Sequence, residues 1–249
     1  MAGHNKWSKV KHIKGPADAK RGKIFSKLSK EITLAAKAGG GNPDMNARLR
    51  SAILSAKGQN MPNDTIERAV KKGTGEIEGA AIEEIIYEGY GPGGVAMMVE
   101  VATDNRNRSA QDMRTTFSKN NGTFADAGSV AYMFQRLGEI RLEKEGLSED
   151  QATELALESG ADDVVDEGDD WVLYTAMDKL FPTGAALKEK NVTPKSQKLI
   201  YHPATTITIE DPDVARQLVR LYDALDDYDD TQNVFANFEL SEQAAAALD

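Results

Sequence analysis

The sequence predicts an α+β protein, with a helical bundle at its N-terminus followed by two α/β domains, one inserted in the other. Residues 1–75 carry 16 Lys and Arg against 5 Asp and Glu, whereas residues 76–249 carry 14 against 35. The hydrophobic pattern changes at the same place, because only helical periodicity occurs before it and strands alternate with helices after it. A charge break and a change of pattern at one position indicate a domain boundary.

The first predicted helix runs from Ala17 to Ala38. Pro16 precedes its start, and three glycines at 39–41 end it. At about 100° per residue, the apolar residues share one side of this helix and the lysines share the opposite side. Arg21 points toward the apolar side and Leu34 toward the basic side, which makes both residues candidates for a domain contact.

Two further helices are predicted over 44–57 and 64–72. In the second of them, Asp64 and Glu67 have the spacing of a capping pair. Three short helices joined by short loops form a small bundle. We expect this basic helical bundle to occupy residues 1–78.

The acidic part of the chain begins with a predicted hairpin, whose strands at 82–88 and 95–103 flank a glycine-rich turn. A helix over 106–120 follows. The next elements are expected in the order strand, helix, strand, strand, helix, strand, which is the pattern of a ferredoxin-like sandwich. They are predicted over 138–145, 149–159, 163–166, 170–175, 178–190 and 196–201.

The last predicted elements are a strand over 205–210, a helix over 212–225 and a strand over 233–240. They have no partners of their own, so we expect them to complete the sheet that begins near residue 82. The region between is then an insertion, and the Ala-rich end of the chain is expected to fray. The predicted domain limits are 79–134 plus 204–240 for the outer α/β domain, 135–203 for the ferredoxin-like insertion and 241–249 for the tail.

The composition excludes several kinds of site and location. The chain has no cysteine, so it has no disulfide framework, thiolate metal site or cysteine nucleophile. His4 and His12 lack the further soft ligands that zinc needs, and we expect no metal and no cofactor. No run of 18 apolar residues occurs, and the N-terminus lacks the apolar stretch of a secretory signal. We therefore expect a cytoplasmic protein without a membrane partner.

No arrangement typical of catalysis occurs in the sequence. The glycine-rich segment 89–94 lacks the Gly-Lys-Ser/Thr ending of a phosphate loop and leads into a strand, which indicates a hairpin turn. The acidic runs 162–170 and 223–230 lack the spacing of a calcium loop and are interpreted as solvated loops. His202 has no candidate serine or acid arranged around it. We predict that the protein is not an enzyme.

The N-terminal segment alternates cations with an aromatic ring and an imidazole, a composition that lets cations meet phosphates while a ring stacks on a base. The alternative is a solvated arm with Trp7 packed on the bundle. The lysine face of the first helix adjoins this segment and favours nucleic-acid binding. The candidate binding residues are Lys6, Trp7, Lys9, Lys11, His12, Lys14, Lys20, Arg21, Lys23, Lys27 and Lys30.

Two further cations, Arg106 and Arg108, lie at the start of the helix predicted over 106–120, after the capping residues Asp104 or Asn105. Cations at a helix N-terminus oppose the helix dipole, so their placement suggests a use other than helix stability. A ligand phosphate and an interdomain salt bridge are equally good interpretations.

Several segments resemble the YebC/PmpR family. They include Met1–Lys9, Asp18–Lys23, Tyr87–Val95, Thr103–Arg108 and Gly128–Val130. The resemblance covers nearly the whole chain and implies three domains around a central cavity. It also implies a function: members are described as DNA-binding transcriptional regulators, mitochondrial relatives are translational activators, and bacterial members have been connected to the ribosome and to stalling at proline runs.

We therefore predict a non-enzymatic, nucleic-acid-binding regulator of gene expression, which by the family description is a DNA-binding transcriptional regulator. The alternative is a translation factor that binds the ribosome through its RNA and activates translation or relieves stalling at proline runs. No recognition helix with Asn, Gln and Arg at base-reading positions is identified beside a dimer seam, which favours recognition of the nucleic-acid backbone or shape. A third hypothesis is a protein-interaction module whose basic head binds an acidic partner protein or the acidic domains of another copy of the chain. The oligomeric state is left open.

This interpretation makes a prediction about the lysine face. Replacing Lys20, Lys23, Lys27 and Lys30 with Glu is expected to abolish nucleic-acid binding. The melting temperature is expected to stay within a few degrees, because the four lysines are interpreted as surface residues.

Overall fold

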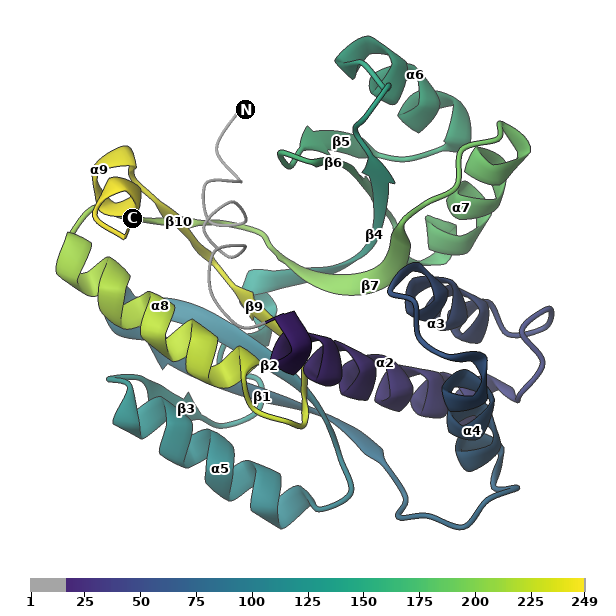
Figure 1. Cartoon of the computed structure of the whole chain (residues 1–249). Coiled ribbons are helices and arrows are strands. Elements are labelled where there is room, and N and C mark those ends of the chain that lie inside the picture. Colours follow the sequence, from purple (N-terminus) through teal and green to yellow (C-terminus); the bar gives the residue numbers. More distant parts are fainter. Residues whose placement is uncertain (1–16, 249) are drawn as a thin grey trace.

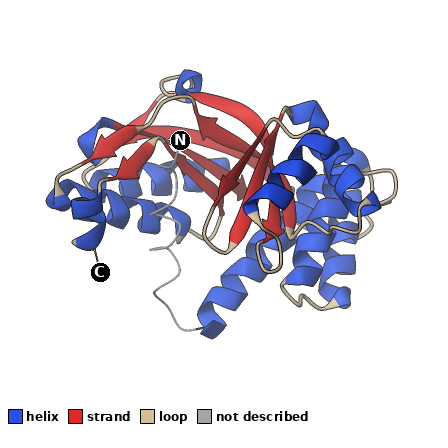
Figure 2. Ribbon diagram, turned by 90° about the horizontal axis from the view of Figure 1, so that it is seen from above, coloured by secondary structure: helices blue, strands red, loops and turns tan. Residues whose placement is uncertain are grey.

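The computed structural model describes residues 17–248, and it describes side chains from Arg21 onward. The strands form the middle of the molecule and helices lie to both sides of them (Figure 2). The N-terminal helices stand beside two antiparallel sheets (Figure 1). No helix within 17–248 is long and apolar enough to cross a membrane.

The N-terminal unit contains helices α2 (Ala17–Gly39), α3 (Ala47–Gly58) and α4 (Asn63–Thr74). Their shared core includes Ile32 and Leu49, which are fully buried. The predicted capping pair in α4 is wrong, because Pro62 occupies the position before the helix and no side chain caps it.

The first sheet has the strand order β3-β1-β2-β9, and all its neighbours are antiparallel. Helices α5 (Arg106–Lys119) and α8 (Pro212–Asp226) lie side by side against it. Every residue of the central strand β2 is buried. The strands are β1 (Glu83–Gly91), β2 (Val95–Thr103), β3 (Thr123–Ala125) and β9 (Thr231–Ala236), and a 3-10 turn (Pro92–Gly94) joins β1 to β2.

The second sheet has the order β5-β6-β4-β7, again with antiparallel neighbours. Helices α6 (Glu149–Ser159) and α7 (Leu180–Glu189) pack on it through a separate core. This is the strand and helix order that the sequence predicts for the insertion. The strands are β4 (Phe134–Glu143), β5 (Asp163–Asp166), β6 (Asp170–Thr175) and β7 (Ser196–Pro203), and 3-10 turns precede β4 (Ala131–Met133) and α7 (Met177–Lys179).

The end of the chain differs from the prediction in two respects. The strand predicted over 233–240 is divided at Asn237, whose side-chain oxygen accepts a hydrogen bond from Ala96 N at 2.7 Å. Only β9 joins the first sheet, and β10 (Phe238–Leu240) instead pairs with β8 (Ile207–Ile209) in a small parallel sheet.

The tail that was expected to fray contains the short helix α9 (Glu242–Ala246). The Ser241 side chain caps this helix, and Ala244 is fully buried against the core of the first sheet. This burial gives the Ala-rich end a packing role that its composition does not reveal.

The fold class is confirmed as α+β, with an N-terminal helical region ahead of strand-rich parts. Strand β9 returns to the first sheet after the whole second sheet, which is the predicted insertion. Leu34, expected at a domain contact, is buried against Ile82 and Ala102 of the first α/β unit.

Candidate nucleic-acid interface

Three of the predicted phosphate-binding lysines face an acidic segment of the same chain. Lys23, Lys27 and Lys30 form one row on α2, which we call the lysine row. Residues 226–230, from the last residue of α8 to the residue before β9, form the acidic loop. The pairs are Lys23 Nζ with Asp227 Oδ1 at 2.7 Å, Lys27 Nζ with Asp226 Oδ1 at 2.9 Å and Lys30 Nζ with Asp230 Oδ1 at 2.7 Å.

The lysine row also binds backbone oxygens at the end of α8. Lys27 Nζ donates to the carbonyl of Asp226 at 3.2 Å, and Lys23 Nζ donates to that of the C-cap residue Asp227 at 3.3 Å. Lys30 Nζ donates to the carbonyl of Asp229, beyond the helix, at 2.7 Å. The last carbonyls of a helix lack intrahelical partners and lie at the negative end of its dipole. The row therefore caps α8 with positive charge.

The three ion pairs differ in exposure. The side chains of Lys23 and Asp227 are 45% and 72% exposed, whereas those of Lys30 and Asp230 are 19% and 11% exposed. Exposed ion pairs contribute about 0–1 kcal/mol, and breaking a buried one costs more because a charge is left without a partner. The Lys30 pair therefore contributes most to the contact between α2 and the acidic loop.

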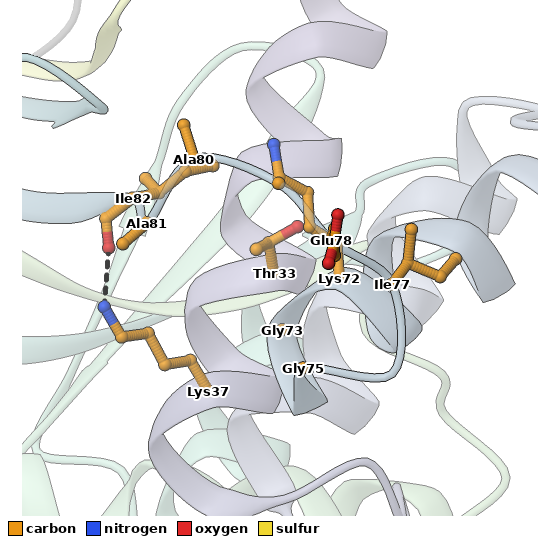
Figure 3. Close-up of a pocket in the computed structure, with 11 residues that line it drawn as sticks. Thr33, Lys37, Lys72, Gly73, Gly75, Ile77, Glu78, Ala80, Ala81 and Ile82 are labelled. Carbon is orange, nitrogen blue, oxygen red and sulfur yellow. Dashed lines mark hydrogen bonds between the residues drawn. The ribbon is translucent and has the colours of Figure 1, made fainter.

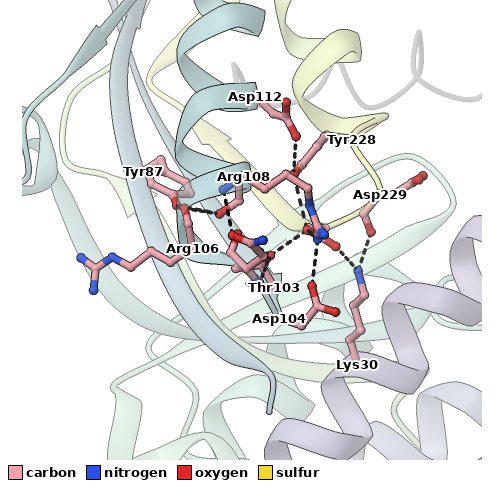
Figure 4. A network of polar contacts seen from close by, with 12 residues as sticks. Lys30, Tyr87, Thr103, Asp104, Arg106, Arg108, Asp112, Tyr228 and Asp229 are labelled. Atoms are coloured by element: carbon pink, nitrogen blue, oxygen red, sulfur yellow. Dashed lines mark hydrogen bonds and ion pairs between the residues drawn. The ribbon is translucent and has the colours of Figure 1, made fainter. Parts of the chain in front are cut away.

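Asp230 is the centre of a polar network that joins α2 to α5 (Figure 4). Its carboxylate accepts hydrogen bonds from Lys30, from Thr103 Oγ1 at 2.8 Å and from Arg108 Nη2 at 3.0 Å. Burial raises the pKa of Asp230, but these donors outweigh it and hold the pKa below its ordinary value. Arg108 also pairs with Asp104 at 2.9 Å.

The two arginines at the start of α5 thus have different surroundings. Arg108 belongs to the Asp230 network, which reaches the bundle through Lys30. Arg106 is exposed, and its guanidinium points away from this network (Figure 4). Asn105 caps the helix by accepting from Arg108 N, as one of the two capping alternatives predicts.

The remaining candidates are placed only in part. Arg21 is exposed, and its guanidinium carbon lies 5.7 Å from the centroid of the Phe25 ring. The side chain of Lys20 lies outside the described residues. The same holds for Lys6, Trp7, Lys9, Lys11, His12 and Lys14.

The contacts of the lysine row correct one expectation. The replacement of Lys20, Lys23, Lys27 and Lys30 by Glu was expected to leave the melting temperature nearly unchanged. Three of these glutamates would face the carboxylates of the acidic loop, and we now expect the replacement to destabilise the protein. The row is a structural contact whether or not it also binds nucleic acid.

Helix α5 carries a polar face that the sequence reasoning missed. Six exposed side chains form this α5 face: Arg106, Asn107, Gln111, Arg114, Ser118 and Lys119. Helix α5 holds four of the 14 cations of residues 76–249 but only one of their 35 acids. A count of cations and acids for each helix, instead of for the two parts of the chain, would have revealed the α5 face.

A cavity of about 700 Å³ lies where the bundle meets both α/β units. Arg48 lines it and pairs with Glu31 at 2.8 Å and Glu84 at 3.0 Å. Arg136 pairs with Glu100 at 2.8 Å, so these arginines are already neutralised. The position of this cavity agrees with the central cavity that the family resemblance implies.

A smaller pocket of about 550 Å³ lies between α2, α4 and the segment that leads to β1 (Figure 3). Lys37 Nζ donates to the carbonyl of Ile82 at 2.9 Å and ties this segment to α2. The pocket wall also contains Lys72 and Glu78. In the described part of the chain, no group of three or more His, Asp or Glu residues is arranged to hold a metal ion.

Fold and charge together define a three-part α+β protein in which residues 1–75 carry 16 of the 30 Lys and Arg. The family model for the TACO1/YebC protein N-terminal domain matches residues 5–76, and the model for the TACO1/YebC second and third domain matches residues 82–238. The chain belongs to the TACO1/YebC family, which confirms the resemblance found in the sequence.

Curated relatives match over the full length. A probable transcriptional regulatory protein of Akkermansia muciniphila is 54% identical over 100% of both chains. Another with the same description, from Syntrophobacter fumaroxidans, is 51% identical over 98% of both chains. The crystal structure of a conserved hypothetical protein from Aquifex aeolicus has a TM-score of 0.89 and 44% identity, and the match covers 95% of this chain and 97% of that one.

Proposed function

We propose that this chain is a non-enzymatic transcriptional regulator that binds DNA and acts in the cytoplasm. The descriptions of the relatives support the regulatory part of this proposal. The observation that carries the DNA-binding part is the lysine row, in which Lys23, Lys27 and Lys30 hold carboxylate and carbonyl oxygens at 2.7–3.3 Å. The phosphodiester oxygens of DNA are acceptors of the same kind, with one negative charge per phosphate as on each carboxylate.

Binding DNA through the row requires that its lysines exchange aspartate for phosphate. The exchange is least costly at Lys23, whose ion pair is the most exposed of the three. It is most costly at Lys30, because Asp230 would lose a donor in a partly buried network. We therefore expect DNA to engage the start of α2 first, together with exposed Arg21 and the predicted N-terminal contacts.

Fluorescence anisotropy with a labelled duplex DNA at several salt concentrations tests this proposal. If five phosphates are neutralised, the slope of log K against log salt should be about −4.5. Replacing Arg21 and Lys23 with Ala should reduce the slope by about 1 to 2. Lys179→Ala with Lys188→Ala removes the same charge from exposed positions of the inserted unit and is the matched control.

The alternative target is tested in the same assay with a folded ribosomal RNA fragment of similar length. Tighter binding of that RNA than of any duplex DNA, at equal salt, would contradict the transcriptional proposal and support the translation factor. If the protein binds neither the duplex DNA nor the RNA, both the transcriptional proposal and the translation-factor alternative are contradicted.

A further inference from the structure

We infer that the α5 face is a second nucleic-acid contact, which reads bases as well as phosphates. This inference rests on the proposed function but concerns a different helix and different residues. The face combines cations with amide side chains, on a unit that is otherwise acidic.

The spacing of four side chains places them on one stripe of the helix. Asn107, Gln111, Arg114 and Ser118 follow one another at intervals of four, three and four residues, and all are exposed. The stripe is about 16 Å long at 1.5 Å per residue. Another side of α5 carries Met113 and Phe117, which are buried in the core of the first sheet, so the stripe faces away from that core.

The chemistry of the stripe fits base edges. Asn and Gln can form paired hydrogen bonds with adenine, and Arg can form them with guanine. Arg106 and Lys119, at the two ends of the helix, are placed to bind phosphates on either side. Arg106 opposes the helix dipole, which is unfavourable unless the cation has another use.

The charges of the face are not neutralised by any residue that the structure describes. Within residues 17–248, none of its six side chains has a hydrogen-bond or ion-pair partner. The single acid of α5, Asp112, accepts a hydrogen bond from Tyr228 and is partly buried. Arg108 is turned to the other flank, where it pairs with Asp104 and Asp230.

One arginine of the face is held in place before any ligand binds. The guanidinium carbon of Arg114 lies 5.1 Å from the centroid of the Phe124 ring. That ring is fixed in turn by Tyr87 and Phe117, at centroid distances of 5.8 Å and 6.2 Å. Stacking leaves the guanidinium N–H groups free to donate, so less conformational entropy is lost when they bind.

The test uses the full-length chain and duplex DNA. The α5 variant carries Arg106→Ala, Arg114→Ala and Lys119→Ala. Its matched control carries Lys179→Ala, Lys188→Ala and Lys190→Ala, which removes the same charge from or beside α7. We expect the α5 variant to bind about tenfold more weakly and to lower the salt slope by about 2 to 3, and the control to bind within about twofold of wild type.

A second variant, Asn107→Ala with Gln111→Ala, separates base reading from charge. It should leave the salt slope unchanged and flatten the sequence preference that selection from a random duplex pool reveals. All replaced side chains are exposed, so we expect each variant to fold like the wild type. Thermal unfolding checks this expectation.

The outcomes separate the two claims. If the wild type binds DNA and the α5 variant binds it as tightly as the control does, the inference is overturned and the proposed function stands. Wild type that binds no DNA would overturn the proposed function itself. A loss confined to the α5 variant would support both.

Discussion

The lysine row of α2 and the α5 face are both basic helix surfaces, but among the residues that the structure describes only the lysine row meets acidic partners. Lys23, Lys27 and Lys30 each pair with an aspartate of the acidic loop, whereas the cations of the α5 face have no acidic partner among the described residues. Asp230 lies between the two helices and pairs with Lys30 of α2 and with Arg108 of α5. The amount of charge on a helix therefore does not determine how much of it a ligand can use.

The largest expected effect of this difference is on stability. Lys30→Glu places a carboxylate against Asp230 in a site where both side chains are less than one-fifth exposed. We expect the free energy of unfolding to fall by about 3 kcal/mol, as when a buried pair is broken. Lys119→Glu on the α5 face should change it by less than about 0.5 kcal/mol. Urea unfolding measures both, and equal losses would show that the lysine row is not a structural contact.

The next effect depends on pH. Donors to Asp230 hold its pKa below the ordinary value of 3.8, against the opposing effect of burial. A lowered pKa in the folded state contributes stability above the ordinary value, and this contribution is lost as the pH falls through the folded-state value. Asp230→Asn should therefore cost about 2 kcal/mol at pH 7.

The gap between wild type and Asp230→Asn should narrow once the pH falls below 3.8. Urea unfolding of both proteins across this range measures the gap. Asp229→Asn, at an exposed neighbouring position, is the control. A gap that is constant down to acid pH would mean that the carboxylate charge of Asp230 is not what stabilises the network.

The smallest expected effect is a change in DNA affinity when the acidic loop loses charge. Asp226→Asn with Asp227→Asn weakens the hold on Lys23 and Lys27 without removing their side chains. If the acidic loop competes with phosphate, DNA affinity should rise about threefold at low salt and less at high salt. Asp213→Asn with Asp223→Asn, at exposed positions on α8, changes the net charge equally and should have a smaller effect. Equal effects would indicate only a change of net charge.

Most elements could be predicted because they are marked locally. The glycines after Ala38 end α2, and the periodicity of each longer helix is clear in the sequence. Strand β3 has only three residues, too few to show an alternating pattern. The division of the last strand at Asn237 depends on a bond to Ala96, 141 residues away.

The pairing of the lysine row with the acidic loop could not be predicted from local sequence patterns. Lys23 and its partner Asp227 are 204 residues apart, and no local pattern connects them. The sequence shows both the lysine face and the acidic run at 223–230, but only the tertiary fold brings them together. The α5 face was overlooked for a different reason, since the acidity of the second part of the chain hides one basic helix.

The first measurement should be residue-resolved amide hydrogen exchange of the full-length protein, with and without a duplex DNA that it binds. If DNA displaces the acidic loop, amides of residues 227–231, which are hydrogen-bonded in the free protein at Asp227, Tyr228 and Thr231, should exchange faster in the complex. Amides of α5 should exchange more slowly. A complex in which the acidic loop is unchanged and α5 is unprotected would contradict both the partner exchange at the lysine row and the contact at α5.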